Sequence, residues 1–575
     1  MNNNDVMPPS QKKFNSYNQP SVNLDGLVVI RARSHGGPGD TGGGHVGEGE
    51  ATTVGPAASD GGNGGIDTEH GNQPVHGIYT RDMRVANSPI VRILDRKTEV
   101  PQPNNLGTKF VETPSFPRID MLSDTIATRG NHQPVWTYGS EGDETRAGTT
   151  GVYTNPFGDL ITGAAKLGAV PGLGFFAVPG LQSLTMFDVF PGAPAVTGGS
   201  TIVFKGNFTV DNVGKTGVFY RNLVDSDING GSGGGTNPVV LIANNIVTKI
   251  PGTTQVFGST SPPSAANGRV VFAGFDDEEK PTLGGIYLAP LAQTPSLKTL
   301  VSIGGRVPGE GVKSTFNNLG EGGAFDGRFV GFWGAWGAKT RTVRLYCPTE
   351  GNKDRIDYCN QKLVCEDTGE IIGDENSTCD ETGCWQEKKV PVNQGIFVHD
   401  TLGGTTRTVA KTKARFDEFL FWNYSGKTPC VGGGHSEEGA EDDGELTRWR
   451  SSAFVAVSGQ ATAFKAVASG GEQGACGSCH SGDGVGSVPP SPFHARLVGI
   501  YLNRHPGQDI ITVLDTRTDG QKIDPEAPAG SKVTELGIER ESLRGDWLVV
   551  NAKMGIEGGT EEEAMAGIYQ TRVPK

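Results

Sequence analysis

The stretch PPSAANGRVVFAG (residues 262–274), followed by GGIYLAP (residues 284–290), decides the fold of this 575-residue chain. Both segments are short runs of β-branched and aromatic residues bounded by Gly, Pro and Asn, a pattern typical of β-strands joined by turns. Strands of the first kind recur at residues 25–32, 200–206, 327–334, 451–459 and 545–552, with a weaker copy at 123–130. The Gly-aliphatic-aromatic signature of the second segment occurs seven times, beginning at Gly77, Gly151, Gly217, Gly285, Gly395, Gly499 and Gly567.

Further strands surround these two in each unit. In four units, a third run of β-branched residues ends with Val-Pro or Ile-Pro. The last residues of these runs are Pro101, Pro171, Pro251 and Pro308. A short aromatic segment precedes the first strand, and these segments open at Phe14, Phe110, Phe187, Phe257, Phe316 and Phe416. Four strands form a small antiparallel sheet that cannot bury its own faces, whereas several sheets stacked around an axis can. We therefore predict an all-β fold, a seven-bladed β-propeller of four-stranded antiparallel sheets.

The expected organisation is a disordered segment over residues 1–13 and a single propeller domain over residues 14–575. The repeats are expected at about residues 14–109, 110–186, 187–256, 257–315, 316–415, 416–532 and 533–575. The last repeat has no third run before Lys575, so we expect the segment at residues 14–22 to pair with it and close the ring. A β-solenoid, or a six-bladed ring with an appended sheet, is the alternative. Spacings of 66 to 110 residues between signatures are too irregular for a solenoid with fixed coils.

Composition and charge exclude several classes of protein. The 87 Gly and 35 Pro residues exclude a helical bundle, because both types destabilise a helix interior. The formal net charge of −14 argues against nucleic acid or an anionic membrane as partner, since both attract a basic face. No membrane span is expected, because no uninterrupted run of about 20 apolar residues is present. The polar start MNNNDVMPPSQKKF (residues 1–14) shows no signal peptide.

Two copies of the repeat carry a resemblance to known proteins. PSVNLDGLVVIRA (residues 20–32), and PPSAANGRVVFAG with GGIYLAP, resemble uncharacterised secreted tandem-repeat β-propeller proteins with GxVVFxG, GIY and VPG repeats. The resemblance covers nearly the whole chain and implies the propeller fold and a secreted or surface location. It implies no activity.

The cysteines fall into disulfide-rich inserts at residues 346–392 and 424–492. All eight lie within one part of the chain: Cys347, Cys359, Cys365, Cys379, Cys384, Cys430, Cys476 and Cys479. An even number at irregular spacing indicates a disulfide framework whose connectivity stays open. Because disulfides persist in oxidising compartments, we expect an extracellular or periplasmic protein.

The motif CGSCH (residues 476–480) has the spacing of a c-type haem attachment site, in which Cys476 and Cys479 bind the porphyrin and His480 ligates the iron. Its flanks are rich in Gly, Ser and Pro without a helical period, so they predict no apolar haem pocket. A disulfide is the favoured interpretation. Haem c, structural zinc and thiol exchange stay open as alternatives.

Acidic and aromatic clusters occur near the second insert. The run from Glu437 to Glu445 lacks EF-hand spacing, so a solvated loop is favoured over a calcium site. The aromatic clusters at residues 329–337 and 416–426 are interpreted mainly as core packing between sheets. The functional alternative is a stacking surface for sugars or peptides, with Trp422, Tyr424 and Trp449 as its candidate residues.

No catalytic motif occurs in its required context, so a non-catalytic protein is favoured and an enzyme stays open. We predict an extracytoplasmic binding or structural protein that recognises a protein or glycan surface through the stapled inserts of repeats five and six. Two alternatives remain. One is an electron-transfer protein with haem c on residues 476–480, and the other is a carbohydrate-active propeller enzyme whose carboxylates converge only in the fold.

Overall fold

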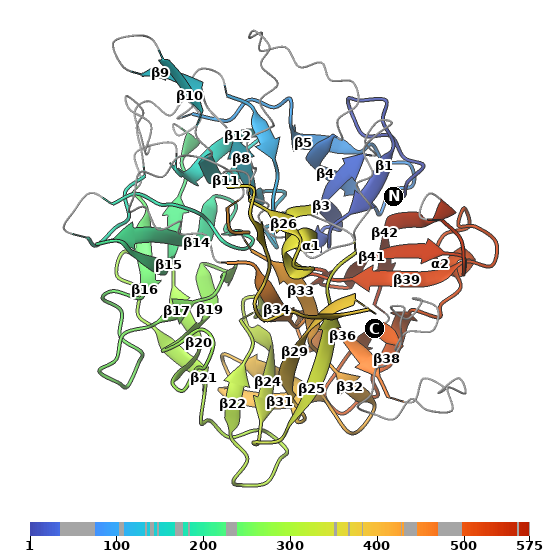
Figure 1. Cartoon of the computed structure of the whole chain (residues 1–575). Helices are drawn as coiled ribbons and strands as arrows, with labels where there is room; N and C mark the ends of the chain where they lie inside the picture. The colour runs from blue at the N-terminus through green and yellow to red at the C-terminus, as the bar shows by residue number, and fades with distance from the viewer. Residues whose placement is uncertain are drawn as a thin grey trace.

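The computed structural model describes residues 1–34, 75–102, 108–132, 135–138, 143–146, 149–166, 176–181, 185–225, 238–321, 323–349, 353–365, 368–381, 383–426, 428–430, 446–469, 497–560 and 563–573. Within these ranges the protein is all-β, as predicted. Most strands belong to antiparallel sheets of four or five strands, which we number sheets 1 to 7 in chain order (Figure 1).

The first four sheets cover the N-terminal half of the chain. Sheet 1 contains β1 (Phe14–Tyr17), β2 (Ser21–Val22), β3 (Leu27–Ser34), β4 (His76–Asp82) and β5 (Val91–Asp95). Sheet 2 contains β6 (Phe110–Glu112), β7 (Arg118–Ile119), β8 (Ile126–His132), β11 (Thr149–Phe157) and β12 (Asp159–Ala165). Sheet 3 contains β13 (Ala195–Thr197), β14 (Thr201–Val210), β15 (Val213–Asn222) and β16 (Val240–Asn244). Sheet 4 contains β17 (Ser259–Thr260), β18 (Ser264–Ala266), β19 (Arg269–Phe275), β20 (Gly284–Pro290) and β21 (Lys298–Ser302).

The remaining three sheets cover the C-terminal half. Sheet 5 contains β22 (Phe316–Leu319), β23 (Ala324–Phe325), β24 (Phe329–Trp336), β30 (Gln394–Asp400) and β31 (Thr405–Lys411). Sheet 6 contains β32 (Phe416–Glu418), β35 (Val455–Ser458), β36 (Ala461–Ala468), β37 (Val498–Asn503) and β38 (Ile511–Asp515). Sheet 7 contains β39 (Lys532–Gly537), β40 (Leu543–Arg544), β41 (Trp547–Gly555) and β42 (Met565–Arg572).

Smaller elements complete the described chain. Two-stranded sheets are formed by β9 (Val135–Tyr138) with β10 (Asp143–Arg146), β26 (Leu363–Val364) with β27 (Ile371–Ile372), and β33 (Phe421–Ser425) with β34 (Arg448–Ser452). A three-stranded sheet is formed by β25 (Thr340–Tyr346), β28 (Thr378–Asp380) and β29 (Gly383–Pro391). The helices are α1 (Lys353–Cys359) and α2 (Gly520–Ile523).

Each Gly-aliphatic-aromatic signature lies on the strand that follows the central long strand of its sheet. These strands are β4, β11, β15, β20, β30, β37 and β42. In sheets 1 to 6 the pairing with the next strand slips by one residue just before the aromatic residue. In sheet 4, Ile286 pairs with Val301 but Tyr287 pairs with Thr299. This β-bulge brings a carbonyl against the signature glycine, and a Cβ on Gly285 would overlap the Val301 oxygen.

The aromatic residue of the signature packs edge-on against the phenylalanine that opens the unit. In sheet 2 the rings of Phe110 and Tyr153 have centroids 4.9 Å apart and planes at 90°. Equivalent pairs in five other sheets are Phe14–Tyr79, Phe187–Phe219, Phe257–Tyr287, Phe316–Phe397 and Phe416–Tyr501. All six phenylalanines are buried. Edge-to-face pairs add to the stabilisation that burial provides, so these pairs contribute to the cores of sheets 1 to 6.

The short strands at one edge of the sheets touch one another in order. We call them the inner strands, and they are β2, β7, β13, β18, β23, β35 and β40. Each inner strand contacts the inner strand of the next sheet, and β40 of sheet 7 contacts β2 of sheet 1. Figure 1 shows the sheets spread in chain order around a common centre.

The N-terminus lies against sheet 7. The backbone amide of Ile568 donates to the Met1 carbonyl at 2.8 Å, and that of Asn3 donates to the Ala566 carbonyl at 3.1 Å. In the segment over residues 1–13, which was expected to be disordered, residues 1–3 therefore pair beside β42, and Met7 is fully buried. Residues 14–22, expected to extend the last sheet, instead pair with β3 of sheet 1. Among the described residues, no helix has the length and apolar character to cross a membrane.

Candidate functional site

Two inserts from neighbouring sheets form one compact unit. The first leaves sheet 5 between β24 and β30 and contains β25 to β29 and α1, and the second leaves sheet 6 between β32 and β35 and contains β33 and β34. We call the described parts of residues 340–391, 421–430 and 446–452 the cap. In Figure 1, α1 and β26 of the cap lie in front of the centre around which the sheets spread.

Three disulfides hold the cap. Cys347–Cys359 ties the end of β25 to α1, and Cys379–Cys384 joins the paired strands β28 and β29. Cys365–Cys430 links the insert of sheet 5 to the insert of sheet 6. A disulfide restricts the unfolded chain and stabilises a small structure by about 2–4 kcal/mol. The disulfide framework predicted from the sequence is confirmed for these six cysteines.

Asp374 is the polar centre of the cap. This buried carboxylate accepts hydrogen bonds from the Tyr424 hydroxyl at 2.7 Å and the Gln386 amide at 2.7 Å. The backbone and side-chain amides of Asn376 donate to its other oxygen. Burial acts to raise the pKa of Asp374, but these hydrogen bonds outweigh it and hold the pKa below its usual value. A charged Asp374 therefore joins the two inserts through its bond to Tyr424.

Aromatic residues pack inside the cap. Tyr424 is only 4% exposed, lies among Cys347, Cys359 and Cys384, and has Trp449 packed against it. Burial and the bond to Asp374 raise the pKa of the Tyr424 phenol well above its usual value. Among the three candidates for a stacking surface, Tyr424 is therefore interior, because its ring lies between the two inserts, as the favoured interpretation of core packing expects. Trp449 and Trp422 are half-buried.

Charged groups anchor the cap to the sheets beneath it. The Arg448 guanidinium reaches Glu278, at 3.0 Å, and Glu279, which lie between β19 and β20 of sheet 4. At the base of the cap, Arg341 of β25 pairs with the buried carboxylate of Glu418 in sheet 6. The cap is thus fixed to three consecutive sheets.

The cap is close to electrically neutral. Its described residues carry eight acidic and nine basic side chains. The negative charge of the chain is therefore not concentrated on the described cap.

Several predicted site residues lie outside the described residues. These are Cys476, Cys479 and His480 of the CGSCH motif and the acidic run from Glu437 to Glu445. The favoured disulfide and solvated loop, and the alternatives of haem and calcium, therefore stay hypotheses. Within the described ranges, no three His, Cys, Asp or Glu side chains converge as metal ligands.

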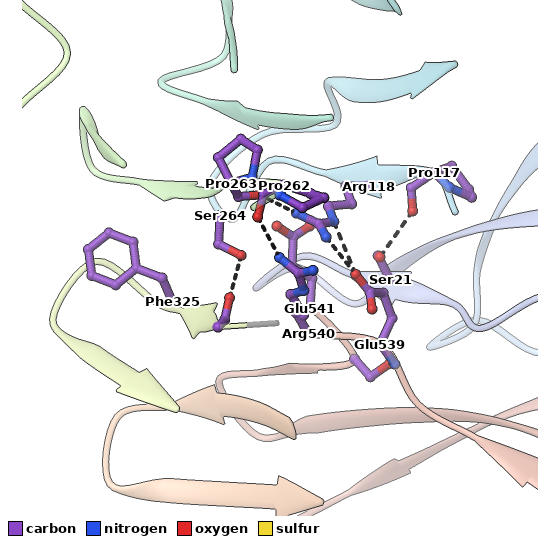
Figure 2. A network of polar contacts seen from close by, with 12 residues as sticks. Ser21, Pro117, Arg118, Pro262, Pro263, Ser264, Phe325, Glu539, Arg540 and Glu541 are labelled. Carbon is purple, nitrogen blue, oxygen red and sulfur yellow. Dashed lines mark hydrogen bonds and ion pairs between the residues drawn. The ribbon is translucent and has the colours of Figure 1, made fainter. Parts of the chain in front are cut away.

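A second cluster of charges, not anticipated from the sequence, lies among the inner strands. Arg118 of sheet 2, only 1% exposed, donates to Glu539 at 2.8 Å and to the Pro263 carbonyl of sheet 4 at 2.7 Å (Figure 2). Arg540 donates to the Pro262 carbonyl. Burial, and to a lesser extent repulsion from Arg118, lowers the pKa of Arg540 to about 10. These arginines join sheets 2, 4 and 7.

In the sequence, this cluster is indicated by an unusual residue at a position that recurs from sheet to sheet. By strand register, Arg118 stands where Ser21 and Ser264 stand in sheets 1 and 4. Each of those serines donates to a carbonyl of the next sheet, Pro117 in one case and Gly323 in the other, as Figure 2 shows. A long charged side chain at a position held elsewhere by a serine reaches farther, which is how Arg118 bridges non-adjacent sheets.

The hydrogen bonds of the cluster connect the sheets, although two of its buried atoms, Glu541 Oε2 and Arg544 Nε, have no hydrogen-bond partner among the described residues. Burial raises the pKa of Glu541, although Arg544 and Arg118 oppose this effect. Arg544 donates to the carbonyls of Val457 and Phe325, which lie in sheets 6 and 5. Arg540 of this cluster is half-buried, whereas Glu539, Glu541 and Arg544 are buried.

Compared with known proteins, the chain matches no family model and no curated sequence.

Proposed function

We propose that the seven sheets are the blades of a seven-bladed β-propeller. The cyclic contacts among the inner strands support this architecture, because they return from sheet 7 to sheet 1. The pairing of residues 1–3 with β42 supports it further, since a terminal strand completing the last sheet is a way to close a ring. An experimental density map of the full chain tests the proposal, and a ring with another number of sheets would contradict it.

On this scaffold the protein acts as a non-catalytic, extracellular or periplasmic binding protein whose recognition surface is the cap. The single observation that carries this function is the Cys365–Cys430 disulfide, which joins inserts from two different sheets. Surface loops without a binding role have no need of a covalent link between them. A surface whose conformation is fixed before binding loses less conformational entropy when a partner docks. The disulfides also support an oxidising compartment.

A variant without the cap tip provides the test. Tyr346 pairs directly with Trp385, so residues 347–384 can be replaced by an Asn-Gly turn that closes the β25–β29 hairpin. Cys430→Ser removes the thiol left without its partner. Intact and shortened proteins are compared on arrays of glycans and of displayed peptides, and circular dichroism checks that the sheets persist.

We expect some array ligands to bind the intact protein. Their affinity for the shortened protein should be at least about tenfold lower, as when residues at the centre of an interface are removed. Hydrogen-exchange protection by those ligands should fall on residues 353–381. Ligands that bind both proteins equally would place recognition outside the cap and contradict the function.

The haem alternative is separable by mass. Electron transfer through haem c at residues 476–480 requires a covalently attached group, which adds its mass to the unreduced and the reduced chain alike. If Cys476 and Cys479 form a disulfide instead, no extra group is present, and reduction of that disulfide increases the mass of the chain by two hydrogens.

A further inference from the structure

The three disulfides of the cap differ in their exposure to solvent. Cys347–Cys359 is enclosed, since its two residues are 8% and 0% exposed. Cys379–Cys384 instead joins an exposed residue, Cys379, to a buried one. Cys379 lies on β28, whose three residues are all exposed and which forms an edge of the sheet of β25, β29 and β28. Exposure therefore favours attack by an external thiol at Cys379 over attack at Cys347 or Cys359.

The bond between Cys379 and Cys384 is not the only link between its two strands. All three residues of β28 pair with β29, and the two cysteines stand directly opposite each other with Cα atoms 4.0 Å apart. Their sequence separation is 5 residues, whereas 12 and 65 residues separate the cysteines of the other two disulfides. A short loop has little conformational entropy to lose, so this disulfide restrains the unfolded chain least. After reduction, the strand pairing would bring the two thiols together again.

The third disulfide, Cys365–Cys430, is less suited to reversible exchange. Cys430 is exposed as well, but the bond ties together two inserts that leave different sheets. Within the described residues no strand pairing holds Cys365 opposite Cys430. Once this bond was cut, its re-formation would depend on how the two inserts dock.

The strand that carries Cys379 has a fixed residue at one end and a glycine at the other. Ser377, directly before β28, is buried. Its carbonyl accepts a hydrogen bond from the Gln361 amide at 2.8 Å, and its hydroxyl accepts one from the Gln386 amide at 3.2 Å. Gly383, at the start of β29, has a φ of 129°, which glycine adopts most readily. Opening the disulfide should therefore free residues 378–381 and leave the attachment at Ser377 in place.

We propose that the Cys379–Cys384 disulfide is a redox switch of the cap, opened by a protein dithiol. One thiolate of the dithiol attacks the Sγ atom of Cys379, and the Sγ–Sγ bond breaks as Cys384 leaves with the electron pair and takes up a proton. The second thiol of the dithiol attacks the mixed disulfide and releases Cys379 as a thiol. The cap gains two electrons and two protons, and the dithiol becomes a disulfide. The reverse exchange with a protein disulfide closes the bond.

The switch would regulate the recognition surface formed by the cap. This regulatory role rests on the proposed function of the cap, whereas the exchange reaction does not depend on that function. In an oxidising compartment the closed bond is the resting form. A dithiol delivered there would open β28 and change the surface that a partner meets.

Alkylation of the folded, full-length protein tests the exchange. The probe is reduced thioredoxin, a protein dithiol, added at increasing concentration. Thiols that become free are blocked with iodoacetamide and identified by mass spectrometry after unfolding. We expect labelling of Cys379 and Cys384 while Cys347 and Cys359 stay bonded. Absence of this labelling, earlier labelling at Cys430, or simultaneous opening of all three disulfides would overturn the proposal.

A variant without the bond tests whether its opening changes the cap. Cys379→Ser combined with Cys384→Ser should lose hydrogen-exchange protection at residues 378–381 and no longer respond to the probe. Thr378→Ser is the matched control, because it changes an exposed residue of the same strand and keeps the disulfide. Equal protection in the double variant and the natural protein would overturn the switch.

Ligand binding separates this inference from the proposed function. Ligands found on the arrays should bind the closed and the open forms with different affinity, and equal affinity would overturn the regulatory role. Selective opening of the bond without any cap-dependent ligand would contradict the proposed function and leave the exchange standing. Cap-dependent ligands without selective opening would contradict this inference alone.

Discussion

The hydroxyl of Tyr424 donates a hydrogen bond of 2.7 Å to the carboxylate of Asp374, and this bond joins the inserts of two different sheets. Removing the hydroxyl leaves one buried carboxylate oxygen with a single donor, the Gln386 amide. Hydrogen bonds to a charged group contribute about 1.5–3 kcal/mol. The bond is therefore a main link between the inserts, alongside Cys365–Cys430.

We predict that Tyr424→Phe loosens the cap by about 1–3 kcal/mol without unfolding the sheets. Hydrogen exchange should accelerate at residues 353–381 and stay unchanged in sheets 1 to 3. Tyr220→Phe is the control, because Tyr220 is a buried tyrosine of sheet 3 far from the cap. Unaltered exchange at residues 353–381 would show that the disulfides alone hold the cap.

A second prediction concerns the buried pair of Arg118 and Glu539. Arg118→Ser restores the residue found at this position in sheets 1 and 4, but it leaves Glu539 buried without its cation. Breaking a buried ion pair costs about 3–5 kcal/mol, whereas replacing both partners costs much less. Arg118→Ser should therefore strongly lower the free energy of unfolding, and adding Glu539→Gln should recover a large part of the loss.

Urea unfolding of the two single variants and the double variant measures this coupling. Arg84→Ser is the control, because Arg84 and Asp82 form an exposed pair, which is worth about 0–1 kcal/mol. Equal losses for Arg118→Ser and Arg84→Ser would mean that the inner cluster does not stabilise the packing of the sheets.

The strands were predictable because their signals are local. Runs such as GRVVFAG place consecutive β-branched and aromatic residues between turn residues, which is a local strand signal. The aromatic residues at 329–337 were expected mainly in the core, and Phe332 and Trp333 are buried as expected. The opening phenylalanines and the signature aromatic residues recur at similar places in the units, so their recurrence could be seen in the sequence. Their edge-on packing could be seen only in the structure.

The cap was harder to predict because its contacts join distant segments. Cysteine spacing indicated disulfides, but the link between Cys365 and Cys430 depends on how two inserts meet. Core packing was favoured for the aromatic cluster at residues 416–426, and Tyr424 was a candidate for the alternative, a stacking surface. The sequence did not decide between them, because an aromatic residue in an insert gives no local sign of what covers it. No sequence motif identified Asp374, because the hydrogen-bond donors that make it a link between the inserts lie up to 50 residues away in the chain.

A third prediction tests the signature glycines. A Cβ at Gly395 would lie 2.6 Å from the Ala410 carbonyl oxygen, which belongs to the neighbouring strand and cannot move without breaking the sheet. Gly395→Ala should destabilise the protein by about 1–3 kcal/mol, as overpacking does. Gly214→Ala should be neutral or slightly stabilising, because no atom lies within 4 Å of the added carbon. Thermal unfolding compares the two, and similar melting temperatures would contradict a steric role for the signature.

The last prediction concerns acid sensitivity. His132 is 1% exposed, its Nε2 atom lies 2.7 Å from the Tyr153 hydroxyl, and burial lowers its pKa to about 3. The unfolded chain, with an ordinary histidine pKa near 6.5, therefore binds the proton more readily than the folded one. Stability from this group is complete above about pH 6.5 and falls as the pH drops from there toward 3, by about 1.4 kcal/mol per pH unit.

His132→Gln removes this proton uptake, so its free energy of unfolding should fall less between about pH 6.5 and 4 than that of the natural protein, by roughly 3 kcal/mol. Urea titrations at a series of pH values measure the difference. The control His505→Gln changes an exposed histidine and should keep the natural acid profile. Parallel profiles for the natural protein and His132→Gln would mean that His132 accepts a proton in the folded state. Its contact with Tyr153 would then have to open in acid.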